Sequence, residues 1–463
     1  MSSRHRSYWL QEVAGDAPDA TPLRARAKAD IAIVGGGYVG LWTAIRIKQS
    51  EPQCDVVILE QDICGGGASG RNGGFVLSWW PKLASLSKMF GTEEAIRVAR
   101  RSEEAIAEIG EFCAAHAIDA DYRQGGWLWA ATSEAQRGAW DGLLDLCSRN
   151  GVDPFRRLDP AEVARRSGST AHREGVFEGT AAIVQPARLA RGLRRVALEM
   201  GVRIFERTKM QTFSRGRPVT IECDTGALLA DTLVIATNAW AARIPELSRA
   251  IVVVSSEMVV TAPIPEELER IGWEPDLGIT DSQLMVDYYR TTRDGRIAFG
   301  KGGSTLAFGG NIGGAFDRNP CRARQVTEDF RRYYPSLDHV PVTHDWSGPI
   351  DRTPNSVPLM GHLGGLEHIV YGVGWSGNGV GPSVIGGKVL AALALRAQNE
   401  WADHPLVDRP ATRFPPEPIR FLGGHIVRAA VERKERAEIR DRAPSWLSVK
   451  LASLAPAGIE DKE

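Results

Sequence analysis

A short apolar strand followed at once by a glycine-rich turn is the feature that most constrains this chain. Residues 31–34 read Ile-Ala-Ile-Val, and they lead into Gly35, Gly37 and Gly40 with the spacing G-x-G-x-x-G, while a second apolar run ends at Glu60. This order predicts a buried strand, a tight turn at Gly35, close approach of a pyrophosphate at Gly37 and close packing of a helix at Gly40. The N-terminus of that helix offers N–H groups and a positive dipole end to phosphates. Because the Glu60 carboxylate is placed to bind a ribose hydroxyl, the segment predicts a dinucleotide-binding site.

The composition excludes several classes of function. The 463 residues include 56 Lys or Arg and 57 Asp or Glu, so no overall charge attracts nucleic acid or an anionic membrane. Six scattered cysteines without C-x-x-C spacing are evidence against a disulfide framework or a zinc site, and favour a reducing compartment. We find no signal core at the N-terminus and no apolar stretch of the roughly 18 residues that span a bilayer. We therefore expect a cytoplasmic protein that binds no metal, has no nucleic-acid partner and has no integral membrane segment.

The pattern along the chain predicts two interleaved domains. Strands of the dinucleotide-binding type occur in three separated stretches, and a strand-rich pattern lies between them, with a hairpin turn at Asp294-Gly295. We predict helices at 91–116, 133–150, 384–397 and 427–439, and strands that include 251–254, 258–261, 283–289 and 296–300. The expected organisation is an irregular arm (1–28), a cofactor domain in three parts (29–90, 179–250, 346–400), a substrate domain (mainly 91–178, with 251–345), and a partly helical tail (401–463).

Two more glycine-rich segments suit a ligand larger than a simple nucleotide. The loop at 65–74 has the composition to pass close to a pyrophosphate, with Arg71 as a charge partner. The segment at 374–381 places small residues and N–H groups just before a predicted helix, where a helix dipole favours developing negative charge.

In this order, these segments resemble the D-amino-acid oxidase superfamily of FAD-dependent oxidoreductases from about residue 28 to residue 397. Gly67-Ala-Ser-Gly-Arg-Asn-Gly-Gly74, Ile235-Ala-Thr-Asn-Ala-Trp240 and Gly374-Trp-Ser-Gly-Asn-Gly379 are especially similar to the γ-glutamylputrescine oxidase branch, which is related to glycine and sarcosine oxidases. The resemblance implies an α/β and α+β fold, in which a discontinuous Rossmann-like FAD domain carries an inserted antiparallel-sheet substrate domain. With the turn residues, it implies FAD contacts from Gly35, Gly37, Tyr38, Val39, Gly40, Glu60, Gln61, Gly67, Ala68, Ser69, Arg71, Asn72, Gly73, Gly74, Met210, Thr237, Asn238, Trp240, Gly374, Trp375, Ser376, Gly377, Asn378, Gly379 and Val380.

Some relatives attach flavin covalently through a histidine near the Ala-Ser-Gly stretch or through a late cysteine. This chain has Ala68, no histidine between residues 60 and 74, and no cysteine after Cys321, although Cys64 lies near the loop. We therefore expect non-covalent FAD.

The resemblance implies oxidation of the C–N bond of a small amine or amino acid. Hydride passes to flavin N5, the imine hydrolyses to a carbonyl compound plus amine or ammonia, and O2 or another acceptor takes the electrons. Tyr288, Arg290, Lys301 and Trp375 are the candidate catalytic residues, with Arg290 placed to bind a distal acidic group and Lys301 to promote O2 reduction. Trp79, Trp80, Trp346, Asp351 and Arg352 are further candidates for the pocket wall.

Three other readings remain open. The same fold serves FAD-dependent dehydrogenases of 2-hydroxy acids or glycerol phosphate, which a substrate panel separates from amine oxidation. A non-catalytic dinucleotide-binding protein, or a flavin-bearing subunit that needs a partner for turnover, is also compatible with the motifs.

Overall fold

The predicted first strand lies at the centre of a mostly parallel sheet. The computed structural model describes residues 5–15 and 20–458, and in it β1 (Arg26–Val34) pairs in parallel with β2 (Val56–Leu59) and β11 (Ala227–Ile235). The strand order is β17-β18-β11-β1-β2-β8, and the antiparallel strands β9 and β10 extend it from β11. The other bounds are β8 (Arg203–Phe205), β9 (Met210–Phe213), β10 (Val219–Cys223), β17 (Leu359–His362) and β18 (Ile369–Val373).

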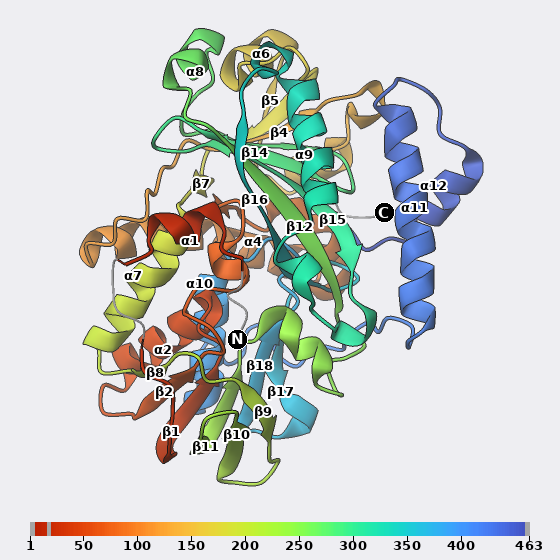
Figure 1. Cartoon of the computed structure of the whole chain (residues 1–463). Helices are drawn as coiled ribbons and strands as arrows, with labels where there is room; N and C mark the ends of the chain where they lie inside the picture. The colour runs from red at the N-terminus through yellow and green to blue at the C-terminus, as the bar shows by residue number, and fades with distance from the viewer. Residues whose placement is uncertain (1–4, 16–19, 459–463) are drawn as a thin grey trace.

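Helices bury the faces of this sheet, as parallel strands require. α2 (Tyr38–Ser50) packs against α10 (Ser383–Leu395) and α7 (Pro186–Glu199), and α10 also contacts α4 (Thr92–Ala115). A side chain at Gly387 would lie 2.4 Å from Trp42 Cβ, so this glycine allows the close approach of α10 to α2. Figure 1 shows this layer below the second sheet.

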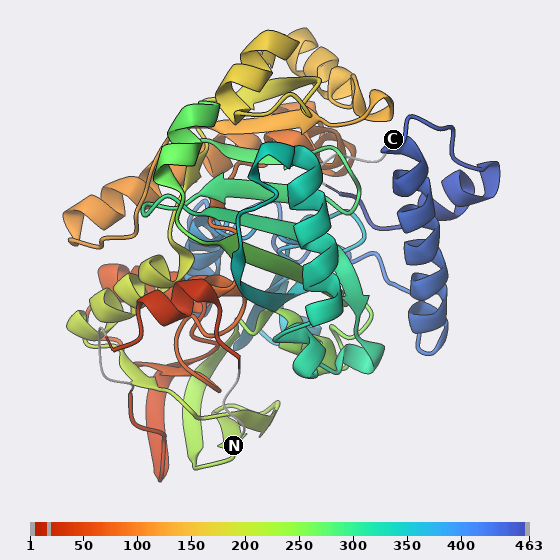
Figure 2. The same cartoon turned by 45° about the horizontal axis from the view of Figure 1, so that its top comes forward.

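The second sheet has the order β16-β12-β15-β14-β13-β4-β6-β5 and is antiparallel except for the parallel pair β13–β4. The turn predicted at Asp294-Gly295 joins β14 to β15, with Gly295 at φ 76°. α9 (Pro320–Tyr333) covers one face, where Phe330 packs on Phe299. Figure 2 shows α9 lying across the strands. The bounds are β4 (Trp127–Ala131), β5 (Arg156–Leu158), β6 (Glu174–Glu178), β12 (Val252–Thr261), β13 (Gly278–Asp281), β14 (Asp287–Thr291), β15 (Ile297–Leu306) and β16 (Val342–Arg352).

Several predicted elements differ from the structure. The arm is not irregular throughout, because α1 (Tyr8–Glu12) buries Trp9, whereas residues 1–4 and 16–19 of the predicted arm, with Pro18, lie outside the described residues. The predicted helix at 133–150 is reduced to a short turn and α5 (Asp141–Arg149). The two strands expected at 251–254 and 258–261 are one, because the intervening polar residues keep their pairing with β16. Sequence periodicity also missed the β9–β10 hairpin, α3 (Leu83–Phe90), α6 (Pro160–Ser167), α8 (Pro265–Ile271) and the small sheet of β3 (Phe75–Val76) with β7 (Ala182–Ile183).

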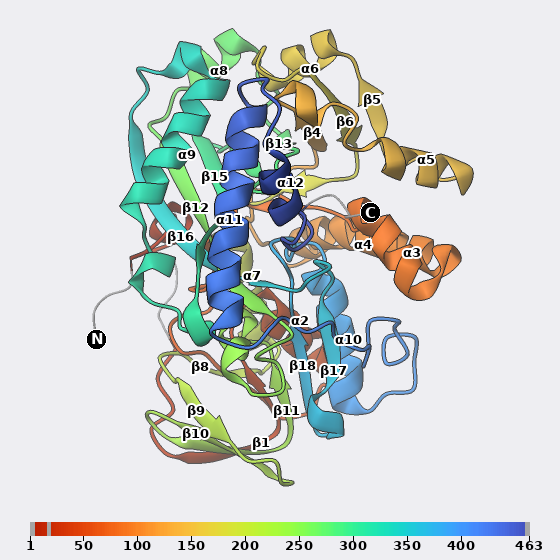
Figure 3. The same cartoon turned by 90° about the vertical axis from the view of Figure 1, so that its right-hand side faces the viewer.

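The C-terminal part forms two helices on the outside of the second sheet. Figure 3 shows α11 (Ile419–Glu438) facing the viewer, with α12 (Trp446–Ala452) beside it. Their attachment includes a small apolar cluster of Met285, Val431 and Ala452. Within the described residues, no helix combines the length and the apolar character needed to cross a membrane.

Candidate active site

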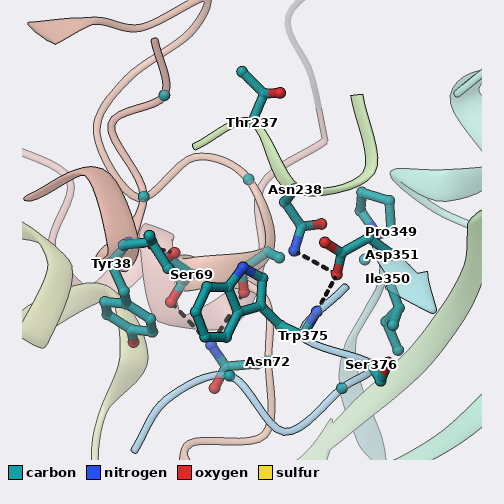
Figure 4. A pocket seen from close by; sticks show the side chains of 18 of the residues that line it. Tyr38, Ser69, Asn72, Thr237, Asn238, Pro349, Ile350, Asp351, Trp375 and Ser376 are labelled. Atoms are coloured by element: carbon teal, nitrogen blue, oxygen red, sulfur yellow. Dashed lines mark hydrogen bonds between the residues drawn. The ribbon is translucent and has the colours of Figure 1, made fainter. Parts of the chain in front are cut away.

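A cavity of about 680 Å³ extends from the first sheet to the second. Its size falls within the range of small-molecule and cofactor sites. Figure 4 shows how segments far apart in the sequence meet there. The predicted residues that line it are Gly35, Gly37, Tyr38, Val39, Glu60, Gln61, Gly67, Ala68, Ser69, Arg71, Asn72, Gly73, Met210, Thr237, Asn238, Trp240, Tyr288, Trp375, Ser376, Gly377, Asn378, Gly379 and Val380.

The first glycine turn has the close contacts that its spacing predicts. Gly35 has φ 114°, and a side chain there would lie 2.4 Å from the oxygen of Ala236. Gly40 is not on the cavity wall, but a Cβ at this position would lie 2.0 Å from the oxygen of Gly35. Gly37 is the N-cap of α2, and it lines the cavity with Tyr38 and Val39, so the start of this helix is turned to the cavity. This arrangement is suited to a pyrophosphate.

The second glycine-rich loop is fixed by its own side chains. Asn72 Nδ2 donates to the oxygens of Ala68 and Ser69 at 3.0 Å each, and Asn72 Oδ1 accepts from the N–H of Gly74 at 2.7 Å. Ser69 Oγ accepts from the N–H of Tyr38 at 2.9 Å, which joins the loop to α2. Figure 4 shows these contacts. Gly74 is outside the cavity wall, yet a side chain there would lie 2.1 Å from the oxygen of Val184.

Asp351, at the end of β16, joins three segments around the cavity. Its carboxylate accepts from Asn238 Nδ2 at 3.0 Å and from the N–H groups of Gly374 and Trp375 at 2.5 and 3.1 Å. Its main-chain oxygen accepts from the N–H of Ser376 at 3.0 Å. Asp351 therefore holds the third glycine-rich segment, in which Gly374 has φ 83° and shapes the turn without lining the cavity.

Two buried carboxylates on the cavity wall have raised pKa values. Glu60 accepts from the N–H groups of Gly36 and Asp62 at 2.8 Å each. Like Asp351, it therefore binds main-chain N–H groups of a turn beside the cavity. Burial raises the pKa of both Glu60 and Asp351 to about 7. Their protonation therefore changes close to neutral pH.

Arg71 lines the cavity, but its charge is held within the protein. Its guanidinium donates to the main-chain oxygens of Gly66 and Ser347 at 3.0 and 3.1 Å, and it pairs with Asp317 at 3.6 Å. These contacts brace the 66–71 loop, and the role of Arg71 as a charge partner for a pyrophosphate stays a prediction.

Arg290 is not in the cavity, contrary to the expectation that it binds an acidic group. The side chain is fully buried and donates to the oxygens of Gly73 and Val184 at 2.8 and 2.6 Å, while its guanidinium lies 4.8 Å from the Trp9 ring. Burial lowers its pKa to about 9. Tyr288 and Arg290 do share one face of β14, but only Tyr288 reaches the cavity, and Arg290 supports the flanking loop.

Lys301 also lies away from the cavity, on the side of β15 that faces α9. Its Nζ pairs with Asp287 at 2.9 Å and with Asp329 at 3.2 Å. Burial by itself lowers the pKa of Lys301, but the charges of Asp287 and Asp329 outweigh it and hold the pKa above its usual value. The neighbouring Gly302 lines the cavity instead, because successive residues of a strand face opposite sides.

Part of the cavity wall is aromatic. Tyr288 and Trp375 line the cavity as predicted, and the Tyr288 hydroxyl forms a hydrogen bond of 2.6 Å with Ser256 Oγ. Trp79 lines it too, whereas Trp80 donates to Glu103 at 2.8 Å and Trp346 donates to the oxygen of Arg71. The lining residues missed by sequence reasoning include Lys82, Trp127, Lys209, Gln211, Arg215, Arg243, Thr280, Val286, Ser356 and Gly458. For the part of the cavity near Lys209, the only local sign in the sequence is the run of polar residues between β8 and β10.

Comparison with known proteins shows the family. A sequence model of the family described as FAD dependent oxidoreductase (DAO) matches residues 30–393, and the chain belongs to this family. It is 28% identical to gamma-glutamylputrescine oxidoreductase of Escherichia coli over 406 residues, which cover 87% of this chain and 92% of that protein. It is 29% identical to the probable oxidoreductase OrdL of Rhizobium meliloti, over 85% of this chain and 89% of the relative.

Solved structures agree on the fold. Glycine oxidase from Geobacillus kaustophilus superposes with a TM-score of 0.69 at 20% identity, covering 84% of this chain and all of the other. L-proline dehydrogenase from P. horikoshii superposes with a TM-score of 0.64 at 21% identity, over 81% and 96% of the two chains. The protein is thus an FAD-dependent oxidoreductase.

The cavity fits FAD on the evidence of its own residues. The tight turn at Gly35, the open start of α2 and the loop at 67–73 form a cradle that added side chains would fill. Among the lining residues of the described chain there is no cysteine or histidine, in agreement with non-covalent FAD. Residues 5–15 and 20–458 contain no group of three or more His, Cys, Asp or Glu arranged to hold a metal ion.

We expect FAD to be held less tightly as the pH falls from about 8 to about 6. Glu60 and Asp351 bind N–H groups of the FAD cradle more strongly as ionised carboxylates than as protonated carboxyl groups. Their raised pKa values place protonation in this pH range. FAD binding therefore favours the ionised forms and releases protons, so affinity rises with pH. Fluorescence titration of apoprotein with FAD measures this, and Glu60→Gln and Asp351→Asn should each flatten the profile. A wild-type affinity that does not change with pH would contradict the prediction.

Lys301→Met is expected to leave reoxidation of the reduced flavin by O2 unchanged and to lower the free energy of unfolding by about 3 kcal/mol, because it removes one partner of a buried ion pair. Anaerobic reduction followed by stopped-flow mixing with O2 measures the first quantity, and urea unfolding the second. Lys434→Met, which removes a more exposed pair with Glu438, is the matched control. A reoxidation rate reduced about tenfold would contradict this prediction and show that Lys301 takes part in the reaction of the reduced flavin with O2.

Proposed function

We propose that this protein oxidises the C–N bond of a small amine that carries a distal acidic group. The observation that carries this proposal is one cavity that combines a nucleotide cradle with aromatic side chains and with cations, among them Lys82 and Arg352, on its wall. When bound, FAD supplies the hydride acceptor at N5. The imine product then hydrolyses to a carbonyl compound plus amine or ammonia, and the electrons pass to O2 or another acceptor.

The side chains of the cavity suit this reaction because hydride transfer needs position more than acid–base chemistry. Trp79, Tyr288 and Trp375 restrict where a small substrate lies and exclude water. The hydrogen bond between the hydroxyl groups of Tyr288 and Ser256 fixes the ring at this wall. The likeness to gamma-glutamylputrescine oxidoreductase supports an amine as the substrate.

Anaerobic titration of the purified holoenzyme tests the proposal. Amines with a distal carboxylate, neutral amines, 2-hydroxy acids and glycerol 3-phosphate are added separately, and loss of the oxidised flavin absorbance is followed. We expect bleaching by the acidic amines, slower bleaching by neutral amines and none by the alcohols. Bleaching by a hydroxy acid alone would replace the proposal with C–O oxidation, and no bleaching by any amine would also overturn it.

A further inference from the structure

Two cations of the cavity wall meet consecutive carbonyl groups of the C-terminal segment. Lys82 Nζ donates to the oxygen of Gly458 at 2.6 Å, and Arg352 Nη2 donates to the oxygen of Ala457 at 2.5 Å. Because Ala457 and Gly458 are consecutive residues, the two cations contact the same short stretch of chain. Lys82, Arg352 and Gly458 all line the cavity.

Arg352 is poorly compensated for a buried cation. Its Nε has no hydrogen-bond partner among the described residues, and burial lowers its pKa to about 10. Its guanidinium donates to the neutral carbonyl of Ala457, whereas planar guanidinium groups bind carboxylates through two parallel hydrogen bonds. A carboxylate placed here satisfies donors that a single carbonyl leaves open.

The segment that contacts these cations covers part of the cavity and lies outside the region of the chain that matches the family. Residues 455–458 follow α12 and return to the cavity, beyond the region 30–393 that the family shares. The N–H of Ala457 donates to the oxygen of Pro354 at 3.2 Å, and Ser356 Oγ donates to the oxygen of Ala457 at 2.7 Å. These polar contacts, together with the burial of Ala457 and the packing of Ala455 on the cluster of Met285, Val431 and Ala452, hold the segment in place.

We propose that Lys82 and Arg352 bind the carboxylate of the substrate, and that residues 455–458 cover this subsite until the carboxylate replaces the carbonyls of Ala457 and Gly458. The inference rests on the proposed function, because it locates the acidic group of the proposed amine. A neutral amine leaves the two carbonyls in place, so the subsite selects by charge. The segment opens and closes with the acidic ligand.

Binding of simple carboxylates to the oxidised holoenzyme tests this without turnover. Glutarate is titrated while the flavin spectrum and tryptophan fluorescence are followed, since Trp79, Trp127 and Trp375 line the cavity, and propionamide serves as the neutral probe. We expect Lys82→Met and Arg352→Met each to weaken glutarate binding at least about tenfold. Arg352→Lys should weaken it less, because the charge stays.

Arg409→Met is the matched control, because Arg409 also donates to carbonyls, at Val357 and Pro358, but is not among the lining residues. A chain ending at Leu454 should bind glutarate more tightly than the full chain, since the competing carbonyls are gone. If Lys82→Met fails to fold, Lys82→Gln takes its place.

Unchanged glutarate affinity in the Lys82 and Arg352 variants would overturn the inference. So would equal weakening of acidic and neutral ligands with a shifted flavin potential, which would assign the cations to the cofactor. If no amine reduces the flavin although glutarate binds through Lys82 and Arg352, the proposed function fails and the anion subsite stands. If acidic amines reduce the flavin but the variants bind glutarate normally, the reverse holds.

Discussion

Asp351→Ala is expected to abolish retention of FAD during purification and to lower the free energy of unfolding by about 3 to 5 kcal/mol. The substitution leaves three donors without this acceptor, namely Asn238 Nδ2 and the buried N–H groups of Gly374 and Trp375. Each unsatisfied buried donor costs about 1 to 3 kcal/mol, and the turn that carries residues 374–380 loses its anchor. Flavin absorbance per mole of protein measures the first effect, and urea unfolding of the apoprotein the second.

A matched control lies on the same strand. Asp345, which also lies on β16, forms an ion pair with the exposed side chain of Arg318. Asp345→Ala should therefore change the stability by less than about 1 kcal/mol and keep FAD. Asp351→Asn retains one acceptor oxygen and should give an intermediate loss. Full retention of FAD by Asp351→Ala would show that the third glycine-rich segment holds its shape without the carboxylate.

Gly40→Ala is expected to weaken FAD binding at least about a hundredfold. The added Cβ would lie 2.0 Å from the oxygen of Gly35 and 3.3 Å from Ile33 Cγ2, so α2 must move away from the turn that faces the pyrophosphate. Backbone atoms cannot yield as a flexible side chain does, and forced packing of this kind costs about 1 to 3 kcal/mol in stability. Titration of the apoprotein with FAD measures the loss of affinity.

Gly423→Ala is the control for this substitution. Gly423 lies in α11 with no atom within 4 Å of an added Cβ, so alanine should raise the stability slightly and leave FAD binding unchanged. Normal FAD affinity in Gly40→Ala would mean that the helix shifts without disturbing the cradle.

The nucleotide end of the site could be predicted from sequence because its residues act locally. The glycine positions are set by contacts within each turn or by the next strand, as with Gly35 and the oxygen of Ala236. Spacing therefore identified the first turn, while glycine-rich composition and the family resemblance identified the loop at 67–74 and the segment at 374–380. The family comparison confirms the FAD-dependent class that these motifs indicated.

The second sheet was less predictable, because alternation gives two faces without saying which of them meets the cavity. Arg290 and Tyr288 do share a face, but the guanidinium of Arg290 donates its hydrogen bonds to the main-chain oxygens of Gly73 and Val184 instead of to a ligand in the cavity. Lys301 shares a face with Phe299, as predicted, and that face carries α9 and its acidic residues. Asp351 and Arg352 were placed only as candidates for the wall. Their roles depend on partners more than 20 residues away, including the carbonyl of Ala457.

The FAD cradle joins stretches of chain that lie hundreds of residues apart. Gly35 meets Ala236, Asp351 meets Asn238, and Asn378 donates to the oxygen of Ser78 at 3.0 Å. None of these contacts exists before the distant segments have come together, so the complete cradle appears late in folding. Flavin added during refolding should therefore trap correctly assembled molecules by mass action. The yellow colour of a preparation then reports the fraction of chains whose distant segments have come together.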